Sequence, residues 1–269
     1  MVPIHHPTFT AIVLAGSRAS HDFVAEKSGV ACKALAHING TPMVIRVLEA
    51  LQQAETISHR ILCGPSWSII EETPALHTRI DSKAIDWVAP QSSPSTSAAS
   101  TLTSIPEETK VLLTTADHAL LTRETIDFFC TESLASQSDV TVGLVPYSIV
   151  QEAFPQSKRT VMKFRDQGYC GCNLFAFLTP KGRAIATFWQ QVEKERKRPI
   201  RLIRMLGWGA VLRYLTGRLS LHQGLAMLSK QLGMTISPVL LPFPRAAIDV
   251  DTVADLELVQ RLAQEQASP

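Results

Sequence analysis

Short apolar runs alternate with stretches of helical periodicity through the first half of the chain. The apolar runs predict buried strands at residues 11–14, 60–62, 85–88, 111–114 and 140–145. The segments between them predict helices at residues 43–53, 67–72, 97–104 and 124–133. This alternation indicates an α/β fold with a mostly parallel sheet covered by helices on both faces. The loops after residues 14, 88 and 114 would then share one edge of the sheet, where open α/β sheets bind ligands.

After residue 146 the pattern changes to a polar, hairpin-like stretch and then to a long helical one. This half predicts strands at residues 159–164, 173–178 and 246–250, and helical periodicity over residues 179–233 and 253–264. No repeat of fixed period and no low-complexity tract divides the sequence. We therefore expect one domain over residues 1–269, with residues 179–235 as a helical insertion or lid within it.

Composition indicates a folded protein and excludes several function classes. Of the 269 residues, 45% are hydrophobic and 19% are charged, so neither a disordered nor a fibrous protein is expected. A formal net charge of +2 is too small to indicate a nucleic-acid partner. No segment approaches the roughly 20 apolar residues of a membrane span. The five cysteines are odd in number and lack zinc-type spacing, which favours reduced thiols in a cytoplasmic protein.

The first predicted strand ends in a short loop that suits an anion. This loop and the cation that follows it comprise Leu14, Ala15, Gly16, Ser17, Arg18 and Lys33. Because Gly16 has no Cβ, the backbone N–H groups after it can close around a phosphate, and Arg18 and Lys33 add positive charge. The loop thus predicts triphosphate binding, although many α/β turns carry a glycine for steric reasons alone.

A single carboxylate follows the strand predicted at residues 111–114. Asp117, at the carboxyl end of a central strand, can hold a Mg²⁺ ion that bridges phosphate oxygens. The alternative is that Asp117 or Thr122 caps the following helix by accepting a backbone N–H, and for Thr122 we expect the cap. His118 is expected to be structural or to orient its neighbour.

Two further carboxylates, Asp249 and Asp251, lie two residues apart in the last predicted strand, which would point both to one face of the sheet. Two like charges on one face need a counterion, and a divalent ion shared with Asp117 would supply it. Alternatively, Asp251 and Thr252 cap the last helix and Asp249 is solvated. Asp255 fits the first turn of that helix, where a negative charge meets the helix dipole.

These three motifs, in this order, resemble the nucleotidyltransferase superfamily with a MobA-like NTP-transferase domain, whose members attach GMP or CMP to cofactors, sugar phosphates and isoprenoid precursors. The resemblance extends from Ala11 to Leu256. It implies a Rossmann-like, three-layer α/β fold of the nucleotide-diphospho-sugar transferase type, with a helical elaboration on the acceptor side. It also implies Mg²⁺-dependent transfer of a nucleoside monophosphate from an NTP, GTP or CTP, to a small phosphorylated or hydroxylated acceptor, with release of pyrophosphate.

The resemblance also implies roles for individual residues. The implied catalytic residues are Arg18, Lys33 and Asp117, and the implied metal ligands are Asp117 and Asp251. The nucleotide would be bound by Leu14, Ala15, Gly16, Ser17, Arg18, Lys33 and Ser97. Ser97 lies in the segment 90–100, where the family reads the base, although a Ser-rich helix cap explains that segment equally well.

Departures from the family pattern leave the base open. Ser17 replaces the usual second glycine, Arg18 and Lys33 are unusually far apart, and Asp117-His118-Ala119 replaces Asp-x-Pro. Two alternatives to a nucleotidyltransferase therefore remain open. They are a glycosyltransferase that uses a nucleotide sugar and a non-catalytic nucleotide-binding sensor. The two cations argue against the first, because a triphosphate needs them more than a diphosphate sugar does. The presence of both Asp117 and Asp251 argues against the second, because a sensor could lose a metal ligand.

For the acceptor, the family position indicates Arg159, Lys163 and Asn173, although cations at a strand edge are more often solvated. A second basic segment covers residues 194–218. It would lie on an anionic membrane surface, bind a lipid-linked or phosphorylated acceptor, or form a solvated helix face. No pattern indicates an oligomeric state.

Overall fold

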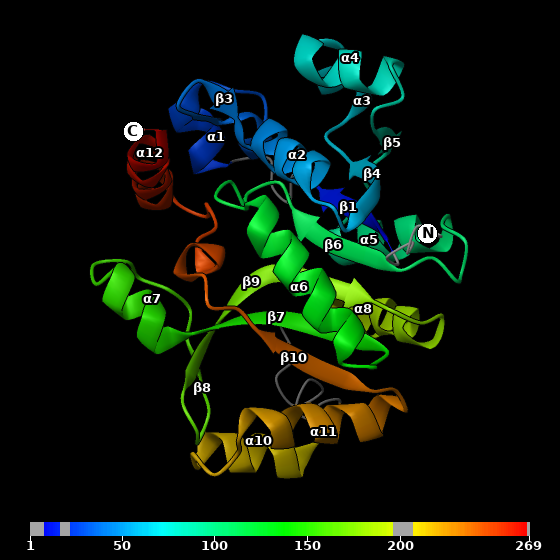
Figure 1. Cartoon of the computed structure of the whole chain (residues 1–269), viewed down its shortest axis with the longest axis vertical. Coiled ribbons are helices and arrows are strands. Elements are labelled where there is room, and N and C mark those ends of the chain that lie inside the picture. Colours follow the sequence, from blue (N-terminus) through cyan, green and yellow to red (C-terminus); the bar gives the residue numbers. More distant parts are fainter. Residues whose placement is uncertain (1–7, 17–21, 196–206, 268–269) are drawn as a thin grey trace, which may run out of the picture.

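An eight-stranded sheet forms the centre of the computed structural model, which describes residues 8–16, 22–195 and 207–267 (Figure 1). Its strands follow the order β10-β7-β9-β6-β1-β4-β5, and β8 pairs with β9. The strands are β1 (Phe9–Leu14), β4 (Ile57–Cys63), β5 (Asp86–Val88), β6 (Val111–Thr115), β7 (Val140–Pro146), β8 (Met162–Lys163), β9 (Gly168–Phe177) and β10 (Ile236–Leu240). A separate two-stranded sheet pairs β2 (His37–Ile38) with β3 (Thr41–Pro42).

Most neighbouring strands of the large sheet run parallel. β1 is parallel to β4 and β6, β4 is parallel to β5, and β10 is parallel to β7. β9 lies antiparallel between β6 and β7. The predicted mostly parallel α/β sheet is therefore confirmed. In its register Leu14 pairs with both Cys63 and Thr115, so the carboxyl ends of β1, β4 and β6 meet at one edge.

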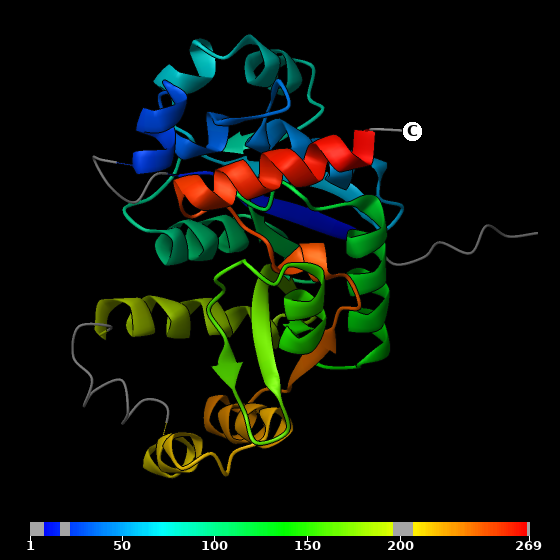
Figure 2. The same cartoon turned by 90° about the vertical axis from the view of Figure 1, so that its left-hand side faces the viewer.

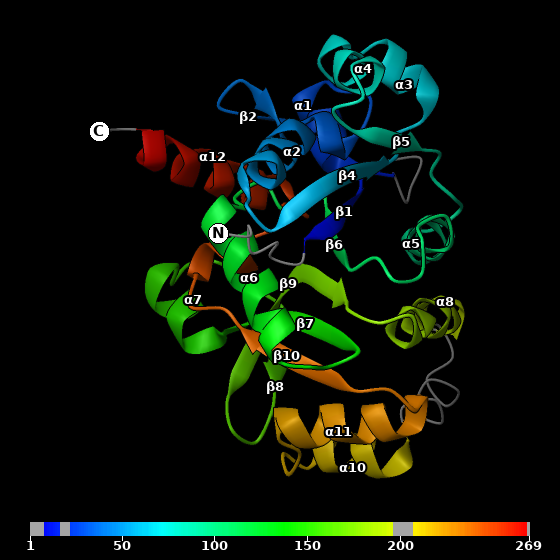
Figure 3. The same cartoon turned by 45° about the vertical axis from the view of Figure 1, so that its right-hand side comes forward.

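Helices cover both faces of the sheet and produce three layers. Ala11 and Val13 of β1 join a core with α2, α6 and α12, whereas Ile12 joins a core with α5, α8 and α11 on the other face. Successive side chains of a strand point to opposite faces, which explains this division. Figure 3 shows α5 and α8 on one side of the sheet and α6, α7 and α12 on the other. The bounds are α1 (Phe23–Ser28), α2 (Met43–Gln53), α3 (Trp67–Glu71), α4 (Pro74–Asp81), α5 (Pro94–Thr103), α6 (Arg123–Ala135), α7 (Tyr147–Ala153), α8 (Ile185–Glu195), α10 (Trp208–Leu215), α11 (Leu221–Leu232) and α12 (Val253–Ala267), with 3₁₀-helices η1 (Lys33–Leu35), η2 (Lys181–Ala184) and η3 (Pro244–Ala247).

The strand predicted at residues 246–250 is wrong. The 3₁₀-helix η3 occupies the start of this segment, and the chain then continues to Val250 without strand pairing. The Val250 backbone N–H instead donates to the Asp117 carbonyl at 3.1 Å, which ties the segment to the end of β6. Four of the five side chains are buried, and this burial produces the strand-like apolar pattern.

The strand at the β7 edge of the sheet is β10, which the sequence pattern did not predict. Pro238 in its middle argues against a strand, but an edge strand tolerates proline because an outward N–H needs no partner in the sheet. The predicted hairpin is also shifted. Phe164 donates its N–H to the Gln167 carbonyl at 3.0 Å in the turn between β8 and β9, so Gly168 and Gly171 belong to β9.

The region after residue 179 is helical, as its periodicity predicts. Its described helices are η2, α8, α10 and α11, and Figure 1 places α10 and α11 together at the end of the molecule opposite α3 and α4. Residues 196–206 of this region lie outside the described residues. Within the described part of the chain, no helix combines the length and the apolar character needed to cross a membrane.

Candidate active site

A cavity of about 300 Å³ lies at the carboxyl ends of β1 and β6. Its walls come from the loop after β1, from η1, from the end of β6, from the middle of β9 and from the segment before α12. The lining residues are Leu14, Ala15, Gly16, Asp22, Lys33, Ala34, Pro94, Thr115, Ala116, Asp117, Asn173, Asp249 and Asp251. Most residues that the sequence indicates as a nucleotide and metal site therefore meet here. Ser17 and Arg18 lie outside the described residues.

Lys33 joins carboxylates from two distant parts of the chain. Its Nζ lies 2.6 Å from Asp117 Oδ2 and 3.1 Å from Asp251 Oδ1. The side chain starts from η1, which is anchored because the next two residues are buried. Burial alone would lower the pKa of Lys33, but the charges of the two carboxylates raise it above its ordinary value. The ammonium group is thus charged at neutral pH.

The carboxylate of Asp117 is oriented by the strand that precedes it. Thr115 Oγ1 donates to Asp117 Oδ1 at 2.5 Å. Helix α6 is capped by Thr122, whose side chain accepts the Thr125 N–H, as predicted for Thr122. Asp117 therefore does not cap the helix, and its carboxylate faces the cavity and Lys33.

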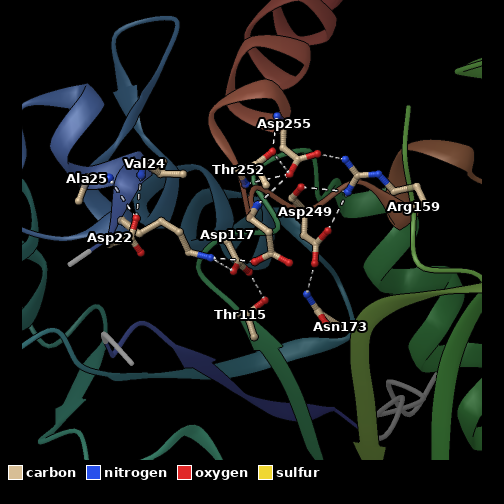
Figure 4. Close-up of polar contacts among 12 residues, drawn as sticks. Asp22, Val24, Ala25, Thr115, Asp117, Arg159, Asn173, Asp249, Thr252 and Asp255 are labelled. Atoms are coloured by element: carbon tan, nitrogen blue, oxygen red, sulfur yellow. Dashed lines mark hydrogen bonds and ion pairs between the residues drawn. The ribbon is translucent and has the colours of Figure 1, made fainter. Parts of the chain in front are cut away.

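Asp249 belongs to a second polar network beside Lys33. Arg159 Nη1 lies 2.9 Å from Asp249 Oδ1, and Arg159 Nη2 pairs with Asp255 (Figure 4). Asn173 Nδ2 donates to Asp249 Oδ2 at 3.1 Å. Burial and the neighbouring carboxylates raise the pKa of Asp249, and Arg159 opposes this shift. Asp249 is therefore held by side chains, contrary to the alternative in which it is solvated.

Asn173 is directed to this network by an irregular backbone. Its φ of +50° lies in the left-handed region, which is uncommon for a residue other than glycine. The pairing register of β9 with β7 shifts between Val142 and Leu144, opposite this part of β9. Strained backbone of this kind concentrates at binding sites, where the surrounding structure enforces it.

The start of α12 is capped by Asp255 and Thr252, which leaves Asp251 available. Asp255 Oδ2 accepts the Thr252 N–H at 2.9 Å and the Thr252 hydroxyl at 2.7 Å, and Thr252 Oγ1 accepts the Asp255 N–H at 3.2 Å. Asp251 contributes its backbone N–H to the same carboxylate at 3.3 Å. Its side chain pairs with Lys33 instead of capping the helix.

The carboxylates of Asp117 and Asp251 suit a divalent cation whose other ligands come from a bound substrate. Oxygens of Asp117 and Asp251 both lie within 3.1 Å of one nitrogen atom, so a single cation at that point can contact both. Mg²⁺ is commonly held by one or two carboxylates together with substrate phosphates. No group of three or more metal-binding side chains occurs among the residues that the structure describes. Phosphate and water oxygens would therefore supply the remaining ligands.

The backbone of the loop after β1 is supported closely by a second glycine. Gly64 has a φ of +82°, and a Cβ atom built on it would lie 2.9 Å from the Gly16 nitrogen. A Cβ on Gly16 would itself lie 3.2 Å from Pro90 Cβ. Ala15 donates its N–H to the Cys63 carbonyl at 2.8 Å. Gly16 is thus closely packed between Pro90 and Gly64, and the loop is tied to the end of β4.

Ser97 lies beside this loop but is engaged within the protein. The segment 90–100 contains the start of α5, which is capped by Ser93. Ser97 Oγ accepts the Gln91 N–H at 2.8 Å. Gln91, Ser97 and Gly16 line one small recess that adjoins the main cavity at Gly16 and Pro94. Both earlier interpretations of this segment, helix cap and proximity to the nucleotide, are compatible with this placement.

A second cavity of about 440 Å³ shares Asn173, Asp249 and Asp251 with the first. The predicted acceptor residues are placed differently around it. Asn173 lies at the junction of the two cavities, and Arg159 lines the second one with its guanidinium paired to Asp249 and Asp255. Lys163 does not line either cavity.

A family model described as the MobA-like NTP transferase domain matches residues 11–153. The chain belongs to this family. It is a nucleotidyltransferase, in agreement with the resemblance carried by its three motifs. No curated protein matches this MobA-like sequence.

Solved structures resemble this MobA-like transferase over nearly its whole length. A hypothetical transferase from Thermus thermophilus is 31% identical, with a TM-score of 0.77, and the match covers 93% of this chain and 99% of that one. A CMP:2-keto-3-deoxy-manno-octonic acid synthetase complexed with CTP is 12% identical, with a TM-score of 0.58 and coverage of 96% and 100%. A 4-diphosphocytidyl-2C-methyl-D-erythritol synthase from Anaerococcus prevotii is 13% identical, with a TM-score of 0.56 and the same coverage. The last two share the fold.

His118 lies next to the site of this MobA-like transferase and is uncharged at neutral pH. Burial lowers its pKa to about 4, and the charge of Asp117 opposes that shift only in part. Neither ring nitrogen has a hydrogen-bond partner at ordinary geometry, although the Ala246 backbone slightly favours the charged form. The side chain is thus buried and uncharged directly after Asp117 in the chain.

Three residues that line or support the site were not predicted from the sequence. Asp22 lines the cavity and caps α1 by accepting the Val24 N–H at 2.9 Å. An aspartate before an apolar helix start is a recognisable N-cap signal, so the capping role of Asp22 could have been predicted. Thr115 orients Asp117, and no sequence signal indicates that role. Gly64 lies two residues after the end of the strand predicted at residues 60–62, as Gly16 does after the strand predicted at residues 11–14, and this parallel would have indicated it.

Proposed function

We propose that the chain transfers a nucleoside monophosphate from GTP or CTP to a small phosphorylated or hydroxylated acceptor, with Mg²⁺ as cofactor and pyrophosphate as the leaving group. The observation that carries this proposal is the convergence of Asp117 and Asp251 on Lys33 beside the glycine loop. Such a set combines an anion-binding loop, a cation and a pair of metal-binding oxygens.

Little acid–base chemistry is needed from the protein for this reaction. An acceptor oxygen would form a bond to the α-phosphorus as the bond to the pyrophosphate oxygen breaks. Lys33 would stabilise the negative charge of the triphosphate, and the backbone around Gly16 would hold its phosphates. Arg18 would add a second cation, on the strength of the family resemblance. Asp117 and Asp251 would hold Mg²⁺, which when bound neutralises phosphate charge and orients the leaving group.

The acceptor would occupy the second cavity, because it meets the first at Asn173, Asp249 and Asp251. Asn173 would contact the acceptor at the junction. Arg159 would act as a positioning residue, since its guanidinium holds Asp249 and Asp255. Lys158 also lines this cavity and would offer a cation to a phosphate group. Lys163 is a weaker candidate, because it lines neither cavity.

Pyrophosphate release tests the proposal. The protein would be incubated with Mg²⁺, each common NTP and pools of small phosphorylated and hydroxylated metabolites. We expect release with one NTP, at least about a hundredfold less with Asp117→Ala, and unchanged release with Asp86→Ala, which removes an exposed carboxylate outside the cavity. Equal release by Asp117→Ala would refute the metal assignment. Nucleotide binding without release across all pools would favour a sensor, and UDP release from UDP-sugars would favour a glycosyltransferase.

A further inference from the structure

Helix α10 presents an apolar surface that no described part of the chain covers. Four of the seven large apolar side chains that are exposed in the described residues belong to this one helix. Trp208, Leu212 and Leu215 are 61%, 64% and 75% exposed, and their spacing of four and three residues places them on one side of the helix. We call these three residues the α10 outer face.

The opposite side of α10 is anchored, so the outer face has a defined direction. Tyr214 packs edge-to-face on Phe164 of the β8–β9 turn, with ring centroids 5.6 Å apart. A Cβ on Gly209 would lie 3.8 Å from the end of the Met227 side chain of α11. Figure 2 shows α10 and α11 at one extreme of the molecule, away from the large sheet's other helices. The α10 outer face therefore points out of the protein.

The stretch that contains α10 and α11 carries charge of one sign. Between positions 207 and 240 it has three Lys and Arg residues and no Asp or Glu residue. Among the described residues, Arg213, Arg218 and Lys230 of this stretch are exposed. Arg165 is close by, since its backbone N–H donates to the Leu219 carbonyl at 2.8 Å. A cationic surface of this kind is complementary to an anionic one.

The β8–β9 turn adds a single carboxylate to this end, and it is already engaged. Asp166 accepts the Tyr169 hydroxyl at 2.8 Å and the Leu221 N–H at 3.2 Å. These hydrogen bonds lower its pKa below the ordinary value, although burial opposes them. The carboxylate thus holds the turn to the start of α11.

We propose that the α10 outer face, with Arg218 beyond the end of the helix, docks the protein peripherally on an anionic lipid surface. Trp208 would sit at the level of the headgroups, Leu212 and Leu215 would enter the acyl boundary, and Arg218 would meet a lipid phosphate. A stretch of exposed apolar and cationic residues that contains no carboxylate is complementary to such a surface. The docking is independent of nucleotide transfer.

Vesicle co-sedimentation tests the docking without nucleotide. We expect the full chain to bind vesicles of phosphatidylcholine mixed with phosphatidylglycerol, and to bind pure phosphatidylcholine at least about tenfold more weakly. Adding salt should weaken the binding, because it screens the charges. Arg218→Gln should weaken it about fivefold, the effect of one basic residue near such a surface, and Arg213→Gln, on the opposite side of α10, should weaken it less. Lys27→Gln, on α1 at the other end of the molecule, is the matched control and should bind like the parent.

The apolar contribution is tested at Leu212 and Leu215. The double variant Leu212→Ser/Leu215→Ser should lose vesicle binding by at least about tenfold. Because both side chains are exposed, we expect its thermal unfolding to match that of the parent, so loss of binding cannot be a folding defect. Leu240→Ser, at an exposed leucine on β10, is the control and should keep binding.

Tryptophan fluorescence locates the contact. Emission should shift to shorter wavelength on anionic vesicles in the parent and in Trp67→Phe, and should not shift in Trp208→Phe, which should still sediment with the vesicles. Equal binding to neutral and anionic vesicles, or binding that survives Leu212→Ser/Leu215→Ser, would overturn the proposal. A dimer in solution that this double variant converts to a monomer would also overturn it, because the face would then bind a second copy. None of these outcomes bears on pyrophosphate release.

Discussion

Lys33 Nζ lies 2.6 Å from Asp117 Oδ2, although the two residues are 84 positions apart in the chain. The same ammonium group reaches Asp251 at 3.1 Å, across 218 positions. One cation thus holds together carboxylates that would otherwise repel each other. In the proposed function this nitrogen lies where a divalent ion would contact the same oxygens, so the lysine and the metal compete for one pair of carboxylates.

That competition predicts opposite effects of one substitution on two ligands. Lys33→Met should strengthen binding of Mn²⁺ alone, by about tenfold, because no ammonium has to be displaced from Asp117 and Asp251. It should weaken NTP binding by about tenfold or more, because a phosphate-binding cation is lost. Electron paramagnetic resonance of Mn²⁺ and calorimetry with NTP measure the two effects. Lys27→Met, outside the cavity, is the control, and weaker Mn²⁺ binding by Lys33→Met would contradict the competition.

Gly64 should affect nucleotide binding through the loop that it supports. A methyl group at this position would come within 2.9 Å of the Gly16 nitrogen, so Gly64→Ala must displace the loop. We expect weaker NTP binding in calorimetry and a loss of stability of at least about 1 kcal/mol, the cost of a positive φ for alanine. Gly40→Ala is a matched control, because Gly40 has a φ of +81° with open space around it. It should lose similar stability without weaker NTP binding, and an equal binding loss in both variants would refute the steric explanation.

Arg159 should contribute much more stability than an exposed arginine. Its side chain is 7% exposed and pairs with Asp249 and Asp255, so Arg159→Leu leaves two carboxylates without their partner. We expect the free energy of unfolding in urea to fall by about 3 kcal/mol. Arg123→Leu, which removes a 45% exposed guanidinium paired with Glu55, should change it by about 1 kcal/mol or less. Similar losses in both variants would show that the Arg159 network is not a buried anchor.

The stabilising role of Asp139 should depend on pH. Burial alone would raise the pKa of this carboxyl, but hydrogen bonds from Thr179 and Thr235 lower it below the ordinary value. A lowered folded-state pKa stabilises the protein above the unfolded-state pKa, and this contribution is lost as the pH falls through the folded-state value. Asp139→Asn should therefore reduce the free energy of unfolding at pH 7, by about 1 kcal/mol, and the difference from the parent should shrink below about pH 4. A difference that stays constant from pH 7 to pH 3 would contradict this assignment.

Local sequence signals were sufficient for the regular part of the fold. The helix predicted at residues 43–53 is α2, with the same bounds, because its apolar positions recur at helical spacing and bury one face. The strand predicted at 111–114 is β6, one residue longer, because a continuous apolar run marks a strand that is buried on both faces. In both elements the spacing of the apolar residues along the chain matches the side chains that are buried in the fold.

Other features depend on contacts that a local pattern does not contain. Residues 246–250 resemble a strand because they are buried, but their hydrogen bonds go to the end of β6 and to a 3₁₀ turn. Asn173 faces Asp249 only because β9 departs from regular pairing beside it. Arg159 was expected at the acceptor, and its partners Asp249 and Asp255, which lie 90 and 96 positions away, could not be predicted from spacing.

Calorimetric titration of GTP and CTP with Mg²⁺ into the parent, Asp117→Asn and Asp251→Asn tests the metal-dependent nucleotide site most directly. Asparagine keeps the size of each side chain and removes its charge, and in each variant Lys33 keeps one of its two carboxylate partners. The proposed site predicts that one nucleotide binds the parent, and that either substitution, or chelation of Mg²⁺, weakens this binding at least about tenfold. Binding of the same affinity in all three proteins, with and without Mg²⁺, would contradict it.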